Sequence, residues 1–532
     1  MAAQRAVVIG GGFGGLCAAQ VLSGHFAEVV VLEQDPVTAE SAHRRGIPQA
    51  HHPHALLARG SAVLERLFPG LGDELAARGA TRADFGESAR YRLPTGWAPR
   101  GRIGLPIQTA TRVTLERCLR HRVFDDPRVT TRPGFTVDGL CWDAEGTRVT
   151  GVTGSALPDA HEEIGADLVV DASGRTTKLP TWLRAAGFGR PKEVAVTGEG
   201  VYTTRLFRAP STADWTTVAE FPRAPDRRRG GVLVTTEDGH RLLTLMGADG
   251  QAAPTDPAGF LDYARTLRSP EFAETITGGE PLGRAHRMAH LDSRWIRYHR
   301  MPRLPGGLLC LGDAVCTLNP VYAQGMTVTA VQAQILGDLL DRGAADLPRV
   351  FQKRVARALA LPWAMATGAD LTWDPHPTPA RARLAQWYLA RLDDVIPGDP
   401  DVFRRFFLAA HLVRSPAVLL APSVLWKVLR PPRRGDQGGA VVDQPGAGNG
   451  QRAVEEGHEQ GGERPDHAEG DHLPLGGVGG GEVVVDQRHE RGGEFLPARP
   501  EDGLGQRPEQ QHPPHRGIAH DEVDERGHGG PR

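Results

Sequence analysis

A glycine-rich turn near the N-terminus limits the folds open to this chain more than any other feature. Gly10, Gly12 and Gly15 follow the spacing G-x-G-x-x-G; the apolar residues 6–9 precede them, and residues 16–22 follow as a helix. The first glycine makes a tight turn, the second lets the backbone approach a pyrophosphate, and the third lets helix and strand pack closely. The free N–H groups of the helix start favour an anion. The pattern therefore predicts a β-α-β unit that binds a dinucleotide.

An acidic residue at the end of the second strand refines this prediction. Residues 28–32 are an apolar run, and Glu33 follows them. A carboxylate there can accept hydrogen bonds from a ribose diol and disfavours a 2′-phosphate. The adenosine of FAD or NAD fits this position better than that of NADP.

Two further motifs combine an apolar strand with a polar turn. Residues 166–175 run from a strand into Asp171-Ala172-Ser173-Gly174-Arg175, and residues 308–311 run into Gly312-Asp313. Each is also typical of an ordinary strand end, and Asp313 could equally serve as a helix N-cap. Asp313 is well placed to bond a polyol such as a ribityl chain. Gly325 and Met326 then open an apolar helix, whose N-terminus can stabilise negative charge on a reduced flavin ring.

In this order and separation, the three motifs resemble those of the class A FAD-dependent monooxygenases, which have a p-hydroxybenzoate hydroxylase-like fold. The resemblance implies that the first motif binds the ADP half of FAD. It links the Asp171–Gly174 turn to FAD and the nicotinamide cofactor, and Gly312-Asp313 to the ribityl chain. Arg112, at the start of a predicted helix over 111–123, resembles a family arginine that contacts FAD.

A closer resemblance covers residues 43–54, His-Arg-Arg-Gly-Ile-Pro-Gln-Ala-His-His-Pro-His, and residues 200–207 and 319–322. These segments are similar to bacterial FAD monooxygenases of secondary metabolism, including polyether epoxidases. The cofactor contacts implied by the resemblance then also include Arg44, Pro320, Gly325 and Met326. Two positions depart from the pattern: His51 replaces an arginine, and Ala323 replaces a glycine in the loop facing the flavin.

The histidines of this segment also allow a metal site to be considered. No nearby cysteine or carboxylate completes a ligand set at standard spacing around His43, His51, His52 and His54. We therefore predict no metal, and a loop packed beside the cofactor instead.

The chain as a whole is predicted to be α/β, with several parts. Residues 190–300 contain four longer strands and a hairpin signal at Asp238-Gly239, which indicates an inserted antiparallel sheet. The predicted parts are a Rossmann-type FAD-binding domain (1–190 and 301–345), an antiparallel-sheet substrate domain (191–300), C-terminal helices (346–434) and a disordered tail (435–532).

The tail has one aromatic residue, Phe495, and cannot bury enough apolar surface to fold. A shifted reading frame in a GC-rich gene is one hypothesis for its origin.

Composition excludes several classes of protein. The net charge of −2 favours neither nucleic acid nor an anionic membrane surface as a partner. The five cysteines lack a C-x-x-C pair, so reduced thiols and a cytoplasmic location are expected. Residues 416–429 are the best candidate for a membrane segment. They are interrupted by Pro422 and Lys427 and fall short of the roughly 20 residues that a span needs, so no stable membrane insertion is expected.

The predicted function is that of an FAD-dependent monooxygenase, a hydroxylase or an epoxidase. The resemblance implies that NAD(P)H, bound transiently, reduces FAD and that a flavin hydroperoxide delivers one atom of O₂. The strands of residues 190–300 carry apolar side chains, so a small apolar organic substrate is expected. Two alternatives stay open: an FAD-dependent reductase or dehydrogenase of a prenyl-type substrate, and a non-catalytic flavin-binding sensor. The sequence identifies no catalytic side chain and no oligomeric state.

The tail gives the first testable prediction. Truncation after residue 434 should leave the FAD content and the thermal midpoint unchanged, because the removed segment lacks apolar periodicity. Absorbance at the flavin maximum and thermal denaturation check this. A large loss of either would show that the tail packs on the folded part.

Overall fold

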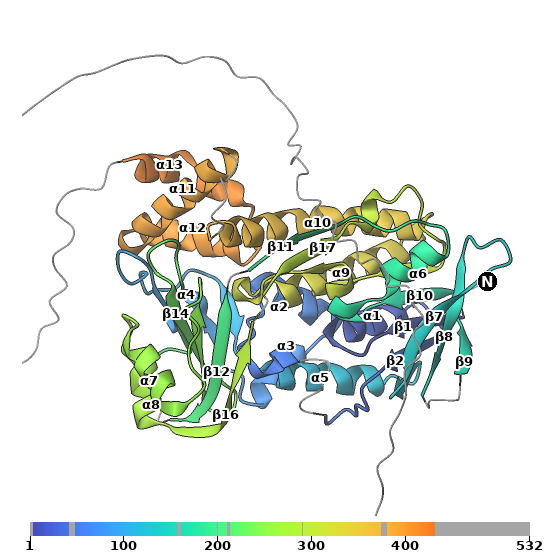
Figure 1. The fold of residues 1–532 in the computed structure, drawn as a ribbon, viewed down its shortest axis with the longest axis horizontal. Helices are drawn as coiled ribbons and strands as arrows, with labels where there is room; N and C mark the ends of the chain where they lie inside the picture. The colour runs from blue at the N-terminus through green and yellow to red at the C-terminus, as the bar shows by residue number, and fades with distance from the viewer. Residues whose placement is uncertain are drawn as a thin grey trace, which may run out of the picture. The chain divides into compact units, whose positions relative to one another are not determined.

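The computed structural model describes residues 4–41, 48–156, 161–198, 200–209, 213–289, 291–373 and 380–430. The predicted tail, Arg44 and His43 lie outside these residues. The described part is a mixed α/β protein, as predicted, with one parallel sheet, several antiparallel sheets and helices at its C-terminal end (Figure 1).

The parallel sheet is built from buried apolar strands. Its order is β18-β10-β1-β2-β6, and every neighbouring pair is parallel. The strands are β1 (Arg5–Ile9), β2 (Glu28–Glu33), β6 (Val129–Pro133), β10 (Leu168–Asp171) and β18 (Leu308–Cys310). The near-continuous Val, Leu and Ile runs of β1, β2, β10 and β18 reflect burial on both faces, which parallel sheets require, whereas the edge strand β6 is mostly polar and partly exposed.

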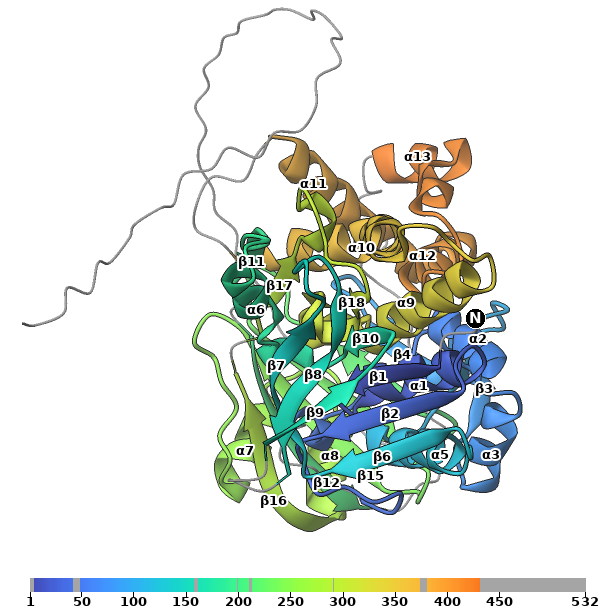
Figure 2. The same cartoon turned by 90° about the vertical axis from the view of Figure 1, so that its right-hand side faces the viewer.

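Helices and a small meander cover this sheet. Helix α1 (Phe13–Ser23) contacts β1, β2, α5 (Arg112–Phe124) and α9 (Gly325–Leu340). A three-stranded antiparallel sheet, β7 (Thr136–Trp142), β8 (Val149–Ser155) and β9 (His161–Gly165), packs against β2 and β10 (Figure 2). The consequence is that the carboxyl ends of β1, β10 and β18 lie together beside the N-termini of α1 and α9.

A six-stranded sheet forms the second layer of the protein. Its order is β16-β12-β15-β14-β13-β4, with β16 (Glu280–Met288), β12 (Val201–Arg208), β15 (Arg241–Gly247), β14 (Arg229–Thr235), β13 (Thr217–Glu220) and β4 (Ala89–Arg92). The predicted hairpin at Asp238-Gly239 is confirmed: β14 and β15 pair antiparallel, and Gly239 has φ +76°. Strand β4 comes from outside the predicted range 191–300 and pairs parallel with β13, so the sheet is not made from one insertion alone.

The two faces of this sheet bury different sets of side chains. One face packs on α7 (Pro257–Arg265) and α8 (Glu271–Gly278) through Phe207, Leu243 and Leu245. The other face presents Tyr202 and Met246. Side chains alternate along a strand, so the apolar residues expected to face a substrate divide between the two faces. Phe207 and Leu243 belong to the core under the helices.

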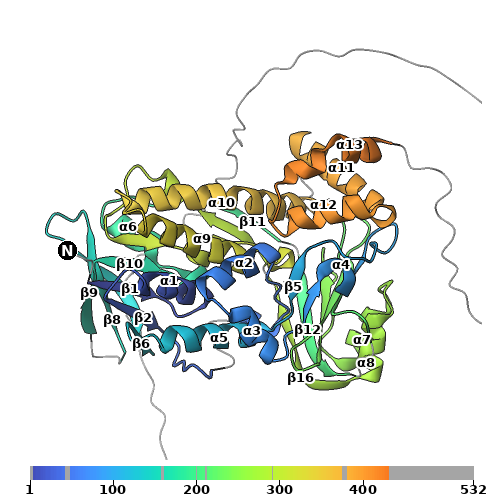
Figure 3. The same cartoon turned by 180° about the vertical axis from the view of Figure 1, so that it is seen from behind.

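The C-terminal helices attach to both layers. They are α10 (Leu347–Asp370), α11 (Ala380–Val395), α12 (Pro400–Ala410) and α13 (Pro422–Leu429), with a 3-10 turn η7 (Pro416–Leu420) between the last two (Figure 3). Phe403 and Phe407 of α12 pack with Phe85 and Tyr91 in a separate apolar core. His411, just after α12, accepts a 3.3 Å hydrogen bond at Nδ1 from the Ala58 N–H, which opens helix α2 (Ala58–Leu67). The residue after α12 thereby binds a free N–H group at the start of α2, and α2 in turn contacts α9.

Candidate flavin-binding site

The glycine turn after β1 has the geometry that the sequence predicted. Gly10 has φ +99°, a conformation that side chains rarely adopt, and its N–H donates to the Leu32 carbonyl at 2.7 Å. A Cβ on Gly15 would lie 1.8 Å from the Gly10 carbonyl oxygen. Gly12 is the N-cap of α1 and supplies no side chain to that cap. Strand and helix can approach this closely only with glycine at these positions, and the first N–H groups of α1 are left for an anion.

Glu33 closes the turn from the second strand. Its buried carboxylate accepts the Gly11 N–H at 2.8 Å and the Asp35 N–H at 2.9 Å. These bonds fix the carboxylate at the end of β2, beside the glycine turn. We propose that it meets the ribose of the adenosine there.

Asp171 is directed into its own turn. Its two oxygens accept hydrogen bonds from the Ser173 N–H at 3.0 Å, the Ser173 hydroxyl and the Thr177 hydroxyl. Burial raises the pKa of Asp171 even though these three donors oppose it. Gly174 follows with φ +83°, and a Cβ there would meet no described atom within 4 Å. Asp171 therefore shapes the turn, while Gly174 leaves space beside it.

Gly312 and Asp313 follow β18 on a 3-10 turn. Gly312 has φ +69°, and its N–H donates to Gln332 Oε1 of α9 at 2.9 Å. Burial raises the pKa of Asp313, and the charges of Arg112 and Arg175 oppose this rise. No described residue donates a hydrogen bond to the Asp313 carboxylate. A polyol would supply such donors, so the structure fits the proposed ribityl contact. The alternative N-cap role is wrong, because Gln324 is the N-cap of α9.

Arg112 begins α5, as predicted, and belongs to a buried charge network. Its Nε donates to Glu116 at 2.8 Å, and its Nη1 lies 3.3 Å from His54 Nε2. Glu116 also pairs with Arg120, which is 1% exposed. A buried cation held by a carboxylate on its own helix keeps a fixed position. Asp313 therefore faces a positive charge of defined geometry.

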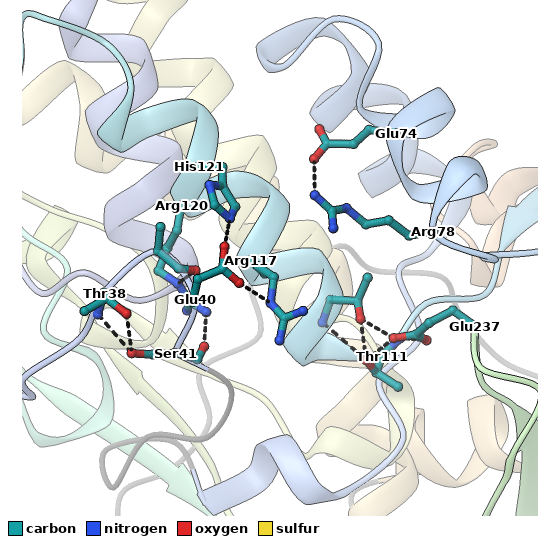
Figure 4. Close-up of polar contacts among 12 residues, drawn as sticks. Thr38, Glu40, Ser41, Glu74, Arg78, Thr111, Arg117, Arg120, His121 and Glu237 are labelled. Atoms are coloured by element: carbon teal, nitrogen blue, oxygen red, sulfur yellow. Dashed lines mark hydrogen bonds and ion pairs between the residues drawn. The ribbon is translucent and has the colours of Figure 1, made fainter. Parts of the chain in front are cut away.

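Helix α5 also holds the loop of residues 38–41 near this network (Figure 4). Arg120 donates to the Ser41 carbonyl, and Glu40 pairs with His121 at 2.7 Å and with Arg117 at 3.7 Å. Residue 41 is the last described residue before the segment that contains Arg44.

The opposite end of α5 is tied to the six-stranded sheet. Thr111, the N-cap of α5, donates its hydroxyl to Glu237 Oε1 at 2.6 Å, and its N–H donates to Glu237 Oε2 at 2.8 Å (Figure 4). Glu237 belongs to the β14–β15 hairpin. The hairpin therefore fixes the helix start that carries Arg112.

The loop before α9 is held by a buried polar network. Asn319 donates from Nδ2 to Asp370 Oδ1 at 2.8 Å and accepts the Tyr202 hydroxyl at 3.4 Å. The Tyr322 hydroxyl also donates to Asp370, at 3.0 Å. Burial raises the pKa of Asp370 to about 6, and the donors Tyr322, Asn319 and Ser293 oppose this rise. Asp370 ends α10, far along the chain from the motifs.

Ala323 lies between this network and α9. It has φ +54°, so the left-handed conformation explains why glycine is usual there in the family that the sequence resembles. Pro320 begins the preceding 3-10 turn, and Met326 is buried. Beyond Ala323, the Gln324 Oε1 is buried with no partner among the described residues, and a Cβ on Gly325 would meet no described atom within 4 Å. An unpaired acceptor and open space therefore coincide at the start of α9.

The described histidines sit at the junction with the sheet. His52 Nδ1 lies 2.6 Å from the Thr204 hydroxyl of β12, and His51 stacks on His286 at 3.7 Å between ring centres. Burial, with Arg112 nearby, lowers the pKa of His54 to about 3. Burial also lowers the pKa of His52 to about 4, and the loss of the charged form at these two rings supports the role of a packed loop.

An apolar cluster of the sheet meets the loop before α9. Tyr202 and Met246 pack with Leu291, and Val321 of the loop packs against them. Phe221, Val232 and Met288 complete the cluster. The loop that leads to α9 therefore packs, through Val321, on an apolar cluster of the six-stranded sheet.

The structure thus gathers most of the predicted positions at one edge of the parallel sheet, whereas Arg44 lies outside the described residues. Sequence reasoning missed Asp370, Ser293 and Glu237. Each of these three polar residues lies in a segment that carries no recognised sequence motif, so the neighbouring sequence does not indicate its role.

The fold and the turn geometry define a dinucleotide-binding flavoprotein. Residues 4–342 match the family described as FAD binding domain, and the chain belongs to this family. It is accordingly a flavoprotein oxidoreductase with FAD as its cofactor.

One relative and two solved structures are similar to this chain. Protein Rv3254 of Mycobacterium tuberculosis is 34% identical over 449 residues, which cover 78% of this chain and 92% of that protein. A flavoprotein/dehydrogenase from Cytophaga hutchinsonii is similar with a TM-score of 0.57 and 16% identity, over 80% of this chain and 96% of the other. PqsL, a probable FAD-dependent monooxygenase from Pseudomonas aeruginosa, is similar with a TM-score of 0.54 and 17% identity, over 69% of this chain and 97% of the other. At these identities the two structures establish a shared fold.

The Asp313 position gives a testable prediction. Asp313→Ala should weaken FAD binding by about 10- to 150-fold, because a charge-assisted hydrogen bond contributes roughly 1.5–3 kcal/mol. The purified variant should be partly apo and regain colour with added FAD, as measured by fluorescence titration. Asp341→Ala, at the far end of α9, is the matched control. Full flavin retention by the Asp313 variant at nanomolar protein would show that Asp313 does not touch the cofactor.

Asp370 gives a prediction on pH. Its pKa of about 6 in the folded state exceeds the ordinary 3.8, so the folded protein binds the proton more tightly than the unfolded chain. Stability from this group is therefore lost as the pH rises from about 4 to about 6. The neutral variant Asp370→Asn should gain in thermal midpoint relative to the parent protein across that window.

The comparison is thermal denaturation at several pH values, with Asp262→Asn at a side chain that is 72% exposed as baseline. A difference between Asp370→Asn and the parent that stays constant from pH 4 to 7 would contradict the raised pKa.

Proposed function

We propose that this protein is an FAD-dependent monooxygenase that adds one atom of O₂ to a small apolar organic substrate, with NAD(P)H as reductant. One observation carries the proposal. The loop that leads into the N-terminus of α9 packs, through Val321 and Asn319, directly on the apolar cluster around Tyr202 and Met246. A helix start that favours negative charge thus lies beside a surface that favours an apolar ligand.

The residues present fit FAD. Gly10 and Gly15 allow the close turn at α1, Glu33 is fixed beside it, and Asp313 carries a half-buried carboxylate to which no described residue donates a hydrogen bond. When bound and reduced, FAD supplies the activation of O₂ and the transfer of one oxygen atom.

The chain's own residues supply orientation and charge. The N-terminus of α9, at Gly325 and Met326, would stabilise negative charge on the reduced ring. Asp370 fixes Asn319 and Tyr322, and so sets the shape of the loop that leads there. The buried side chains of Tyr202, Met246 and Leu291 exclude water, which lowers the dielectric and suppresses loss of oxygen as H₂O₂.

Incorporation of oxygen into the product distinguishes the proposed monooxygenase from a reductase and from a flavin-binding sensor. The fold alone does not, because it is shared with a protein named a flavoprotein/dehydrogenase. A reductase would transfer hydride without incorporating oxygen, and a sensor would bind flavin without turnover.

The purified holoprotein should therefore oxidise NADH or NADPH, and faster with its true substrate. Without substrate, most reducing equivalents should appear as H₂O₂, because no acceptor captures the oxygen. With substrate, mass spectrometry should find one atom from ¹⁸O₂ in the product, as a hydroxyl or an epoxide. Equal turnover under strict anaerobiosis, with a reduced double bond in the product, would establish the reductase instead. Yellow, folded protein that oxidises neither nicotinamide would support the sensor.

A further inference from the structure

The exposed apolar side chains of this protein are confined to one region. Every large hydrophobic residue that is exposed in the described part of the chain lies between positions 384 and 429, at 42–65% exposure. They are Leu384, Trp387, Leu389, Val413, Leu420, Trp426 and Leu429. In Figures 1 and 3, α11 and α13 lie on the outer side of α12. Folded soluble proteins rarely gather so many exposed apolar residues in one place without using them.

The exposure of these side chains does not result from poor packing of the helices on the protein. The inner faces of the same helices are buried, with Leu392 of α11 and Val424 and Val428 of α13 at 0% exposure. The outer residues have their own helical spacing: Leu384 and Trp387 on α11, and Trp426 and Leu429 on α13. Both helices therefore have a second apolar side that faces away from the protein.

Most of the exposed charges in this region are basic. Among described residues 380–430, Arg383, Arg404, Arg414 and Arg430 are exposed, whereas the Asp401 side chain, which is 45% exposed, is paired with Arg405. Three of the four acidic residues are paired: Asp394 with Arg391, Asp399 with Lys427, and Asp401 with Arg405. The fourth, Asp393, is largely withdrawn from solvent, and burial raises its pKa to about 6. The net charge of the whole chain conceals this basic region, because residues 435–532 carry 20 acidic and 9 basic residues.

The basic and aromatic groups at the end of α13 are joined to each other and to α11. The Arg430 guanidinium lies 3.4 Å from the centre of the Trp426 ring. From α11, Arg391 donates to the Arg430 carbonyl at 2.7 Å, so the end of α13 is joined to α11. We name the exposed tryptophans, leucines and arginines of α11, η7, α13 and the adjoining residues of this region the C-terminal surface.

We propose that the C-terminal surface docks on an anionic lipid bilayer as a peripheral membrane contact. Tryptophan has an apolar body and a polar N–H, so it is stabilised at the boundary between headgroups and acyl chains. Exposed leucines would enter that boundary, and the arginines would pair with lipid phosphates. Within the described residues no helix is long and apolar enough to cross a membrane, so the contact would be parallel to the bilayer surface.

A second copy of the chain is a poorer occupant. A two-fold interface sets the same patch against itself, and it would bring the exposed arginines of two copies into one interface without adding an opposite charge. The bilayer supplies instead a surface of opposite charge. The proposal does not depend on the monooxygenase reaction, although an apolar substrate would itself be concentrated in lipid.

Co-sedimentation of the full-length holoprotein with vesicles tests the proposal. Vesicles of phosphatidylcholine alone are compared with vesicles that also contain phosphatidylglycerol. The holoprotein should sediment with the anionic vesicles and remain largely free with the neutral ones. Charge reversal by R414E/R430E, and removal of the rings by W387S/W426S, should each weaken vesicle binding at least about tenfold. R184E/R190E, at two exposed arginines on and after α6 (Leu179–Ala185), changes the net charge equally and should bind as the parent does.

Three outcomes would overturn the proposal. The first is that the full chain remains in the supernatant with both vesicle types. The second is that only a chain truncated after residue 434 binds, which would show that the tail covers the surface. The third is equal loss of binding in R184E/R190E, which would show attraction by net charge alone. FAD content and NAD(P)H oxidation without substrate should be unchanged in all variants, so failure here is separable from failure of the proposed reaction.

Discussion

The contact between Gly10 and Gly15 is the constraint on which the rest of the site depends. A Cβ on Gly15 would lie 1.8 Å from the Gly10 carbonyl oxygen, a distance that no relaxation of a side chain could relieve, because the clash is with backbone. The N-terminus of α1 is therefore set by two glycines rather than by packing. From that point the register of β1 with β10, and of β10 with β18, brings the Asp171 and Gly312 turns to the same edge.

Burial and pairing compete at each carboxylate of this edge. Asp171 is met by a backbone N–H and two hydroxyls, yet burial still raises its pKa, so neutral donors do not offset the loss of water. Asp313 depends on the more distant charges of Arg112 and Arg175. The two carboxylates therefore have different roles. Asp171 receives its hydrogen bonds from the protein, whereas Asp313 would receive them from a ligand. The same competition at Asp370 leaves its pKa raised to about 6, because three donors only partly oppose the effect of burial.

The sequence predicted the parts of the fold that are set locally. The strands β1, β2, β10 and β18, the helix start at Gly325, and the hairpin at Asp238-Gly239 follow from glycine placement and apolar periodicity within short windows, whereas α1 begins at Phe13, three residues before the predicted start. Glu237 and Asp370 lay beyond such reasoning. Each acts on a residue more than 45 positions away, at Thr111 and Asn319, and only the folded chain brings them together. Strand β16 was missed for a related reason, since it is polar and half exposed at the edge of its sheet and lacks an apolar pattern.

The alternation of the six-stranded sheet explains how one element serves two purposes. Phe207 and Leu243 hold α7 and α8 in place, while Tyr202 and Met246, one side-chain face away, border the loop before α9. A shift of one residue in the register of β12 would exchange the two sets and remove the apolar border. That register is pinned on the loop side by polar contacts: Thr204 bonds both His52 and Thr244, and Tyr202 bonds Asn319. The hydrogen bonds around the proposed flavin space therefore act mainly by fixing the register of β12. Through that register they determine which apolar side chains a substrate would meet.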